Sequence, residues 1–161
     1  MEQSGGKWRN RRIVFRGTSY HTIDDKGRVV IPSRFRELLR SEDGDRIMVS
    51  RMDQCLVAFP MPVWQQLEDR IRTDAKKNDF MRRFRRVFIG GAHECTCDKQ
   101  DRILIPPALR QYAGLNKEIA LVGVLDHFEI WSREKHENEE LMLQNDLKDL
   151  EARNAIADLG I

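Results

Sequence analysis

The strongest constraint on the fold is a segment that occurs twice. Residues 23–32 read IDDKGRVVIP, and residues 97–106, 74 positions later, read CDKQDRILIP. Both copies contain an aspartate and an arginine four positions apart, followed by three aliphatic residues and a proline. Such self-similarity indicates repeated structural units, and two copies are too few for a solenoid. We therefore expect two halves that meet as two identical subunits would.

Each copy predicts the same short elements. A turn at 25–27, where Gly27 can adopt a positive φ, separates strand candidates at 18–23 and 29–31. The continuous aliphatic run at 29–31 predicts a strand buried on both faces. One or two helical turns are expected at 33–40. Further strands are predicted at 47–49 and 56–59, and then at 94–97, 102–105, 119–122 and 128–131.

Helices are expected between the copies and after the second one. A helix beginning near Pro62 carries an apolar stripe, and a second helix places arginines 82–86 around an apolar face. Ser132 is a plausible N-cap for a final acidic helix that carries Leu143, Leu147 and Leu150. This last stripe fits packing on the chain's own body or on a neighbour, the former being commoner. The arginine run fits either a DNA-binding face or pairing with the acidic tail of the same or a neighbouring chain, and we expect the second.

Composition bounds the function classes. With 28 Lys and Arg against 26 Asp and Glu, the net charge of +2 excludes a uniformly basic nucleic-acid coat. At 40% hydrophobic residues the chain can bury a core, and no apolar run approaches the roughly 20 residues of a membrane helix. Three cysteines make no disulfide framework, which favours a cytosolic protein.

Charge is unevenly distributed. Residues 70–86 hold eight bases against two acids, whereas residues 132–161 hold four bases against eight acids. Residues 1–13 hold four bases against one acid. A mildly basic body with an acidic tail is compatible with nucleic-acid binding on one face, although most such charges simply solvate helix faces.

The repeated aspartate–arginine turn carries the functional argument. An aspartate can accept hydrogen bonds from turn amides and from the guanidinium four residues later, which would hold the turn and aim the arginine. A guanidinium fork suits guanine edges and phosphates. A single copy would be weak evidence, because a turn-stabilising ion pair explains it equally well. Two copies in register favour a functional role.

The chain resembles the MraZ family in four segments. They are Phe15-Arg16-Gly17, the two aspartate–arginine motifs with their Ile-Pro endings, and residues 128–131. The resemblance covers about residues 14–145. It implies a transcriptional regulator with two tandem SpoVT-AbrB, swapped-hairpin domains. It also implies ring-shaped oligomers that bind short direct repeats upstream of their own operon, the division and cell-wall cluster.

The resemblance also implies roles for individual residues. It assigns the main DNA contacts to Arg28 and Arg102, held by Asp24 and Asp98, with Gly27 shaping the first turn. The nearby candidates for phosphate contacts are Arg16, Lys26, Arg34, Arg36, Lys99 and Arg110.

Two departures from the family pattern matter. Asp101 stands where the family's second turn has glycine. Aspartate tolerates the left-handed region, but its charge beside Arg102 is expected to weaken DNA contact there, so Arg28 should contribute more. The family also begins at Met-Phe-Arg-Gly, the place that Val14 to Gly17 occupy here. We therefore hypothesise that translation starts at Val14; otherwise residues 1–13 are a basic arm.

Other chemistry has weaker support. His93, Cys95 and Cys97 alternate, but their spacing is unlike that of zinc sites, so core cysteines are the better interpretation. No acid, base or nucleophile constellation and no phosphate-binding glycine loop is present in the sequence. We therefore predict no catalytic activity, no metal, no cofactor and no small-molecule substrate.

The combined prediction is a mixed α/β chain of two AbrB-like swapped-hairpin β-barrel halves with flanking helices and pseudo-two-fold symmetry. We expect a cytoplasmic, nucleoid-associated homo-oligomer that binds double-stranded DNA with short direct repeats. No contact with a membrane is expected. The alternatives are a partner-binding ring with only non-specific DNA affinity, and an enzyme on a small double-barrel scaffold. The expected segments are a flexible basic extension at 1–13, SpoVT-AbrB-like domains at 14–62 and 88–132, linking helices at 63–87 and an acidic helical tail at 133–161.

Overall fold

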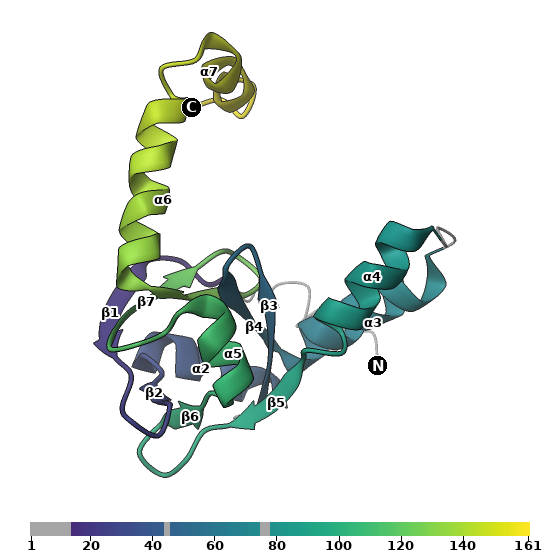
Figure 1. Cartoon of the computed structure of the whole chain (residues 1–161), viewed down its shortest axis with the longest axis vertical. Coiled ribbons are helices and arrows are strands. Elements are labelled where there is room, and N and C mark those ends of the chain that lie inside the picture. Colours follow the sequence, from purple (N-terminus) through teal and green to yellow (C-terminus); the bar gives the residue numbers. More distant parts are fainter. Residues whose placement is uncertain (1–13, 44–45, 75–77) are drawn as a thin grey trace.

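The computed structural model describes residues 14–43, 46–74 and 78–161 (Figure 1). The predictions for residues 1–13 lie outside this part of the chain. The strands are β1 (Thr18–Thr22), β2 (Arg28–Val30), β3 (Arg46–Met52), β4 (Cys55–Pro60), β5 (His93–Thr96), β6 (Arg102–Leu104), β7 (Glu118–Gly123) and β8 (Phe128–Ser132). The helices are α2 (Ser33–Asp43), α3 (Met61–Thr73), α4 (Asp79–Phe88), α5 (Pro107–Ala113), α6 (Arg133–Asp146) and α7 (Leu150–Ala157).

The strands form an antiparallel six-stranded sheet and a separate two-stranded ribbon. The sheet order is β1-β7-β8-β4-β3-β5, and β2 pairs with β6. Each half thus sends its first strand to an edge of the sheet, where it pairs with a strand of the other half. This exchange confirms the predicted swapped-hairpin halves with mixed α/β architecture.

The ribbon lies on the pseudo-two-fold axis. Val29 pairs with Ile103, and on either side of them Arg28 pairs with Leu104 and Val30 with Arg102. Residues that are equivalent in the two copies therefore exchange places across the ribbon. The same symmetry continues beyond it, because Ile31 N donates to Asp101 O at 2.9 Å and Ile105 N donates to Gly27 O at 2.8 Å.

The main core lies under the ribbon. The rings of Phe15, Phe35 and Phe128 pack with centroids 5.0 to 5.5 Å apart, and Val29 and Ile103 are fully buried beside them. The prediction that residues 29–31 are buried on both faces is wrong, because Val30 is 42% exposed. The ribbon has one face on the core and one in solvent, so its side chains alternate.

A second core lies on the other face of the sheet. Trp64 of α3 is 1% exposed and packs against Phe59 of β4 and Phe88 of α4. β4 faces both cores and is buried along its whole length. As Figure 1 shows, α3 and α4 form a hairpin that extends away from the sheet.

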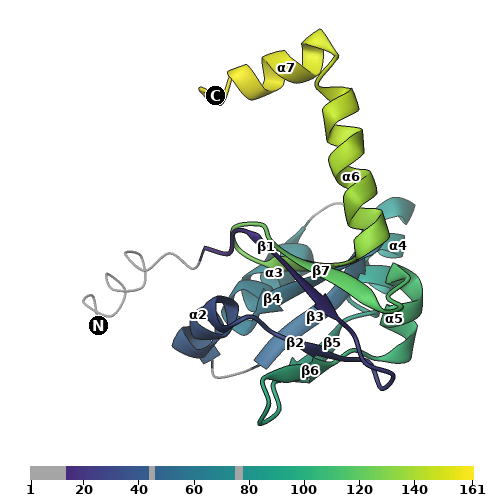
Figure 2. The ribbon, with the colours of Figure 1, turned by 90° about the vertical axis from the view of Figure 1, so that its left-hand side faces the viewer.

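The C-terminal helices project from a different side of the body, near β1 and β7 (Figure 1). Ser132 Oγ accepts from Lys135 N at 3.2 Å, which confirms the predicted N-cap of α6. The chain turns at residues 147–149, where Asp149 caps α7. The prediction that the leucine stripe of this last helix packs on the chain's own body is wrong. The helix α6 leads away from the sheet (Figure 2), and Leu143 and Leu150 are 54% and 72% exposed. In the described part of the chain no helix is long and apolar enough to cross a bilayer.

Candidate functional site

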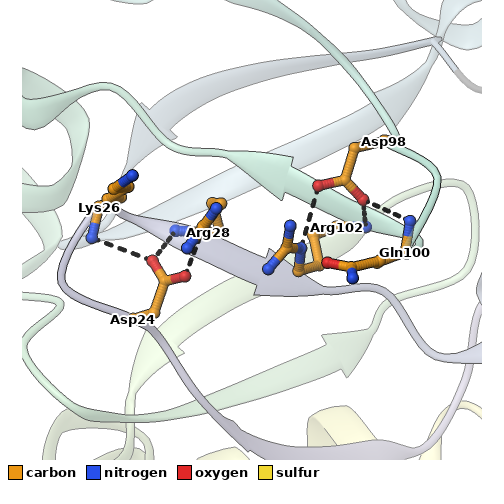
Figure 3. Close-up of polar contacts among 6 residues, drawn as sticks. All are labelled: Asp24, Lys26, Arg28, Asp98, Gln100 and Arg102. Carbon is orange, nitrogen blue, oxygen red and sulfur yellow. Dashed lines mark hydrogen bonds and ion pairs between the residues drawn. The ribbon is translucent and has the colours of Figure 1, made fainter.

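The two aspartate–arginine turns lie at opposite ends of the β2–β6 ribbon (Figure 3). The turn at 24–27 leads into β2, and the turn at 98–101 leads into β6. Because the two strands are antiparallel, each turn lies beside the far end of the other strand. The ribbon therefore presents both arginines on one continuous surface.

The first turn is held by the carboxylate of Asp24. Its Oδ1 accepts from the backbone N–H groups of Lys26 at 3.0 Å and Arg28 at 2.8 Å. Its Oδ2 accepts from Nε of Arg28 at 2.6 Å. Gly27 has a φ of +91°, and its N–H donates to Asp24 O at 2.9 Å. These bonds fix the guanidinium through Nε and do not use its two terminal nitrogens.

The second turn repeats this geometry with different residues. Oδ1 of Asp98 accepts from the backbone N–H groups of Gln100 at 2.8 Å and Arg102 at 3.0 Å. Its Oδ2 accepts from Nε of Arg102 at 3.0 Å. Asp101 takes the place of Gly27 with a φ of +63°. Aspartate thus does adopt the left-handed conformation that the turn requires.

The carboxylate of Asp101 is bound by the first half of the chain. Arg36 Nη1 lies 2.8 Å from Oδ2, and Arg40 Nη2 lies 3.0 Å from Oδ1. Both arginines are on α2, one helical turn apart. The charge beside Arg102 is therefore already paired with two cations. Arg40 was not among the predicted site residues, although its spacing of four from Arg36 on a helix was the available signal.

In the first turn, the space beside Gly27, the residue equivalent to Asp101, is filled by Arg110 of the second half. A Cβ atom at Gly27 would lie 2.6 Å from Nε of Arg110 and 2.8 Å from the carbonyl oxygen of Ile105. That same Nε donates to Ile105 O at 3.0 Å, as Nε of Arg36 donates to Ile31 O at 2.9 Å. Arg36 and Arg110 are thus equivalent residues that support the end of each ribbon strand.

Hydrogen bonding keeps both turn carboxylates ionised. The backbone N–H of Arg28 is the main cause that lowers the pKa of Asp24 below its ordinary value, and the side chain of the same arginine adds to it. For Asp98 the backbone N–H of Arg102 lowers the pKa in the same way. Each turn therefore keeps its carboxylate as an acceptor at neutral pH.

The outer face of the ribbon combines cations with aliphatic side chains. Arg28 and Val30 alternate with buried Val29 on β2, and Arg102 and Leu104 do the same on β6. Val30 and Leu104 are 42% and 56% exposed. The sequence analysis missed these two aliphatic residues as part of the site. The continuous aliphatic runs at 29–31 and 103–105 gave no signal for this, since the alternation appears only in the burial pattern of the two strands.

The remaining residues predicted to contact phosphates lie in two places. Lys26 and Lys99 are exposed in the two turns, next to the main arginines. Arg16 and Arg34 are exposed elsewhere, and Arg34 lies beside Gly17, the residue after Arg16, since a Cβ at Gly17 would lie 3.0 Å from Nη2 of Arg34. The structure thus places Lys26 with Arg28 and Lys99 with Arg102.

The cysteines lie in the cores. Cys55 and Cys95 are buried, and burial raises the pKa of Cys95 to about 12, so its thiol stays protonated at neutral pH. His93 is exposed on the same strand. Within residues 14–43, 46–74 and 78–161, no group of three or more His, Cys, Asp or Glu side chains is placed to hold a metal ion.

Comparison with known proteins gives one consistent result. The sequence profile of the family described as "MraZ protein, putative antitoxin-like" matches residues 14–87 and matches again at residues 88–156. The two matches each contain one aspartate–arginine turn. Together they span most of the chain.

Three curated relatives share one name. A protein named transcriptional regulator MraZ from Desulforapulum autotrophicum is 52% identical over 92% of this chain and 100% of its own length. Its namesake from Desulfosudis oleivorans is 51% identical over the same shares. A third, from Moorella thermoacetica, is 45% identical over 77% of this chain and 85% of its own length.

Proposed function

Because the chain belongs to the MraZ family, we propose that it is a DNA-binding transcriptional regulator. The observation that carries the proposal is the outer face of the ribbon, where two turns hold Arg28 and Arg102 by Nε. Arginines fixed in this way lose little further conformational entropy on binding. A preorganised guanidinium is suited to recognise a defined partner.

The ribbon fits direct reading of base edges. A two-stranded β-ribbon is narrow enough to enter the major groove of B-DNA, and arginine pairs with O6 and N7 of guanine. The terminal nitrogens of Arg28 and Arg102 are the groups that would make this contact. Leu104 lies opposite Arg28 and Val30 lies opposite Arg102, and these two exposed side chains would contact thymine methyl groups. The pseudo-two-fold axis would then place equivalent contacts on both sides of one groove segment.

Phosphate contacts would flank this ribbon. Lys26 and Lys99 are the exposed cations nearest to it, and Arg16 and Arg34 are exposed elsewhere. Arg36 and Arg110 first support the strand ends through their Nε atoms, so their phosphate contacts would use the terminal nitrogens. Phosphate contacts set the orientation of the protein and make the affinity depend on salt.

Repeated sites would supply the remaining affinity. We propose that the chain forms a ring-shaped homo-oligomer in the cytoplasm, associated with the nucleoid. This ring would engage short direct repeats upstream of the chain's own division and cell-wall operon. Later contacts of a multivalent assembly are intramolecular, which adds roughly 10²–10⁴-fold in avidity. A net charge of only +2 is compatible with tight binding on these terms.

The test compares DNA upstream of the protein's own gene with a scrambled duplex of equal length, at several salt concentrations. Arg28→Ala should abolish the preference for the native duplex, whereas Lys26→Ala should weaken both duplexes equally and reduce the salt dependence. Gln65→Ala, at an exposed residue of α3 remote from the ribbon, is the control. Equal binding of both duplexes by the wild type would contradict sequence-specific regulation. No binding at low salt by an assembled ring would favour a partner-binding ring instead.

A further inference from the structure

The C-terminal arm, α6 with α7, carries apolar side chains that the described part of the chain does not cover. Leu141, Met142 and Leu143 are 63%, 52% and 54% exposed, and Leu150 is 72% exposed. Three consecutive helical residues point about 100° apart, so no single packing face can bury all of them. The described part of the chain therefore leaves this arm open to a partner, and one partner surface can cover only some of these side chains.

The same arm is acidic. Residues 132–161 hold four bases against eight acids. Asp146 and Glu151 lie exposed on either side of the turn between α6 and α7, close in sequence to Leu143 and Leu150. The surface that would cover this part of the arm should therefore be apolar at its centre and basic at its edge.

The α3–α4 hairpin offers such a surface. A groove of about 360 Å³ between the two helices has Ile71 and Ile89 in its lining. Arg72, Arg85 and Arg86, with Glu68, complete the lining. The sequence from residue 70 to 86 holds eight bases against two acids. The groove is apolar inside and basic outside, which is the complement of the arm.

Not all of these arginines are engaged within the hairpin. Arg85 Nη2 donates to the carbonyl oxygen of Ile71 at 2.7 Å and so caps α3, and Arg72 pairs with Asp69 at 3.1 Å. Arg83 and Arg86 are exposed, and among the described residues no carboxylate lies within ion-pair distance of either. These two cations are available to a partner.

One chain cannot join its own two surfaces. In Figure 1 the hairpin extends from the end of the sheet near β3 and β5, whereas the arm rises from the side of β1 and β7. Figure 2, turned by 90°, shows the arm directed away from the body as well. Pairing of the arginine run with the tail of the same chain is therefore absent from the described residues, and the partner has to be another molecule.

We propose that the acidic arm of one chain docks on the basic α3–α4 hairpin of a second copy. Leu143 and Leu150 would enter the groove beside Ile71 and Ile89, while Asp146 and Glu151 face Arg83 and Arg86. The two surfaces differ, so the contact is heterologous and each chain both gives an arm and receives one. Such contacts generate rings when the rotation closes. The inference rests on the self-association within the proposed function, but not on DNA binding.

The test measures the native mass of the full-length protein without DNA, by light scattering and native mass spectrometry. The hairpin variant is Arg83→Glu with Arg86→Glu, and the arm variant is Asp146→Lys with Glu151→Lys. Each should fall from a multimer to one chain of 18.9 kDa. Because all four positions are exposed, both variants should retain the wild-type circular dichroism spectrum. Glu37→Lys, a charge reversal on exposed α2, is the control and should leave the multimer intact.

Two mixing experiments make the geometry falsifiable. In an equimolar mixture the acidic arm of the hairpin variant meets an intact basic hairpin, and the lysine arm of the arm variant meets a glutamate hairpin. The two variants should therefore assemble together into a multimer in which they alternate. Combining all four reversals in one chain should restore the multimer. A wild-type monomer, multimers that survive both variants, or a mixture that stays monomeric would overturn the proposal. So would a hairpin variant that loses DNA binding but still self-associates, since the hairpin would then be a nucleic-acid surface.

Discussion

The turn before β2 and the turn before β6 have the same hydrogen bonds but different neighbours. Both need a residue at positive φ, which is Gly27 at +91° in one and Asp101 at +63° in the other. Gly27 leaves room for Arg110 to lie against the turn, whereas Asp101 reaches out to Arg36 and Arg40. The comparison shows that one backbone geometry can be met either by removing a side chain or by pairing one.

The largest expected effect is that of Gly27→Ala. A methyl group there would adopt a left-handed conformation and clash with Arg110 and the carbonyl oxygen of Ile105. The free energy of unfolding should fall by about 2–4 kcal/mol, measured by chemical denaturation. Gly114→Ala is the matched control, because its φ is +65° but its nearest neighbour is the flexible side chain of Lys135. It should lose only about 1 kcal/mol, and equal losses would show that the close packing around Gly27 is unimportant.

DNA binding gives the next largest contrast. Arg28→Ala should weaken binding to the native duplex roughly 10- to 100-fold, which is the usual contribution of one arginine–guanine contact. Arg102→Ala should weaken it less, because Asp101 adds negative charge to the second turn. Titration of one labelled duplex with both variants measures the difference. Equal losses would mean that Arg36 and Arg40 neutralise Asp101 completely.

Acidification should affect the two turns alike. The pKa values of Asp24 and Asp98 are lowered by the folded state, so their stabilisation is present above the ordinary aspartate pKa of about 3.9 and is lost as the pH falls through the folded values. Asp24→Asn and Asp98→Asn should each lower stability at pH 7 and reduce the loss on acidification. Denaturation between pH 7 and pH 3 measures this. A variant with the wild-type pH dependence would show that the carboxylate it lacks contributes nothing to the loss of stability on acidification.

The smallest effect is expected for Asp101→Gly, which gives the second turn the residue of the first. It removes ion pairs with Arg36 and Arg40, which are partly exposed and contribute about 0–1 kcal/mol. It also relieves a left-handed side chain, which offsets much of that loss. The free energy of unfolding should therefore change by no more than about 0.5 kcal/mol. A loss as large as that of Gly27→Ala would assign Asp101 a structural role that its exposure does not suggest.

Patterns within one copy predicted local structure well, and contacts between copies were harder to foresee. The turn at 25–27, the Ser132 cap and the strand positions follow from residues close in sequence, and the structure has them. The ion pairs of Asp101 join residues more than 60 positions apart, and no periodicity in a single sequence encodes them. The exposure of Val30 depends on the ribbon having one free face, which the aliphatic run alone did not reveal.

The exchange of strands between halves also bears on how the chain acquires its structure. β1 finds its partner β7 about 100 residues later, since Thr18 pairs with Val122. Nearly all of the polypeptide must therefore leave the ribosome before the first strand can enter the sheet. Contacts of such long sequence separation slow folding, because a large loop must close before they form. The two halves should consequently fold and unfold as one cooperative unit, and a fragment that ends at residue 87 should leave its first hairpin without a place to bind.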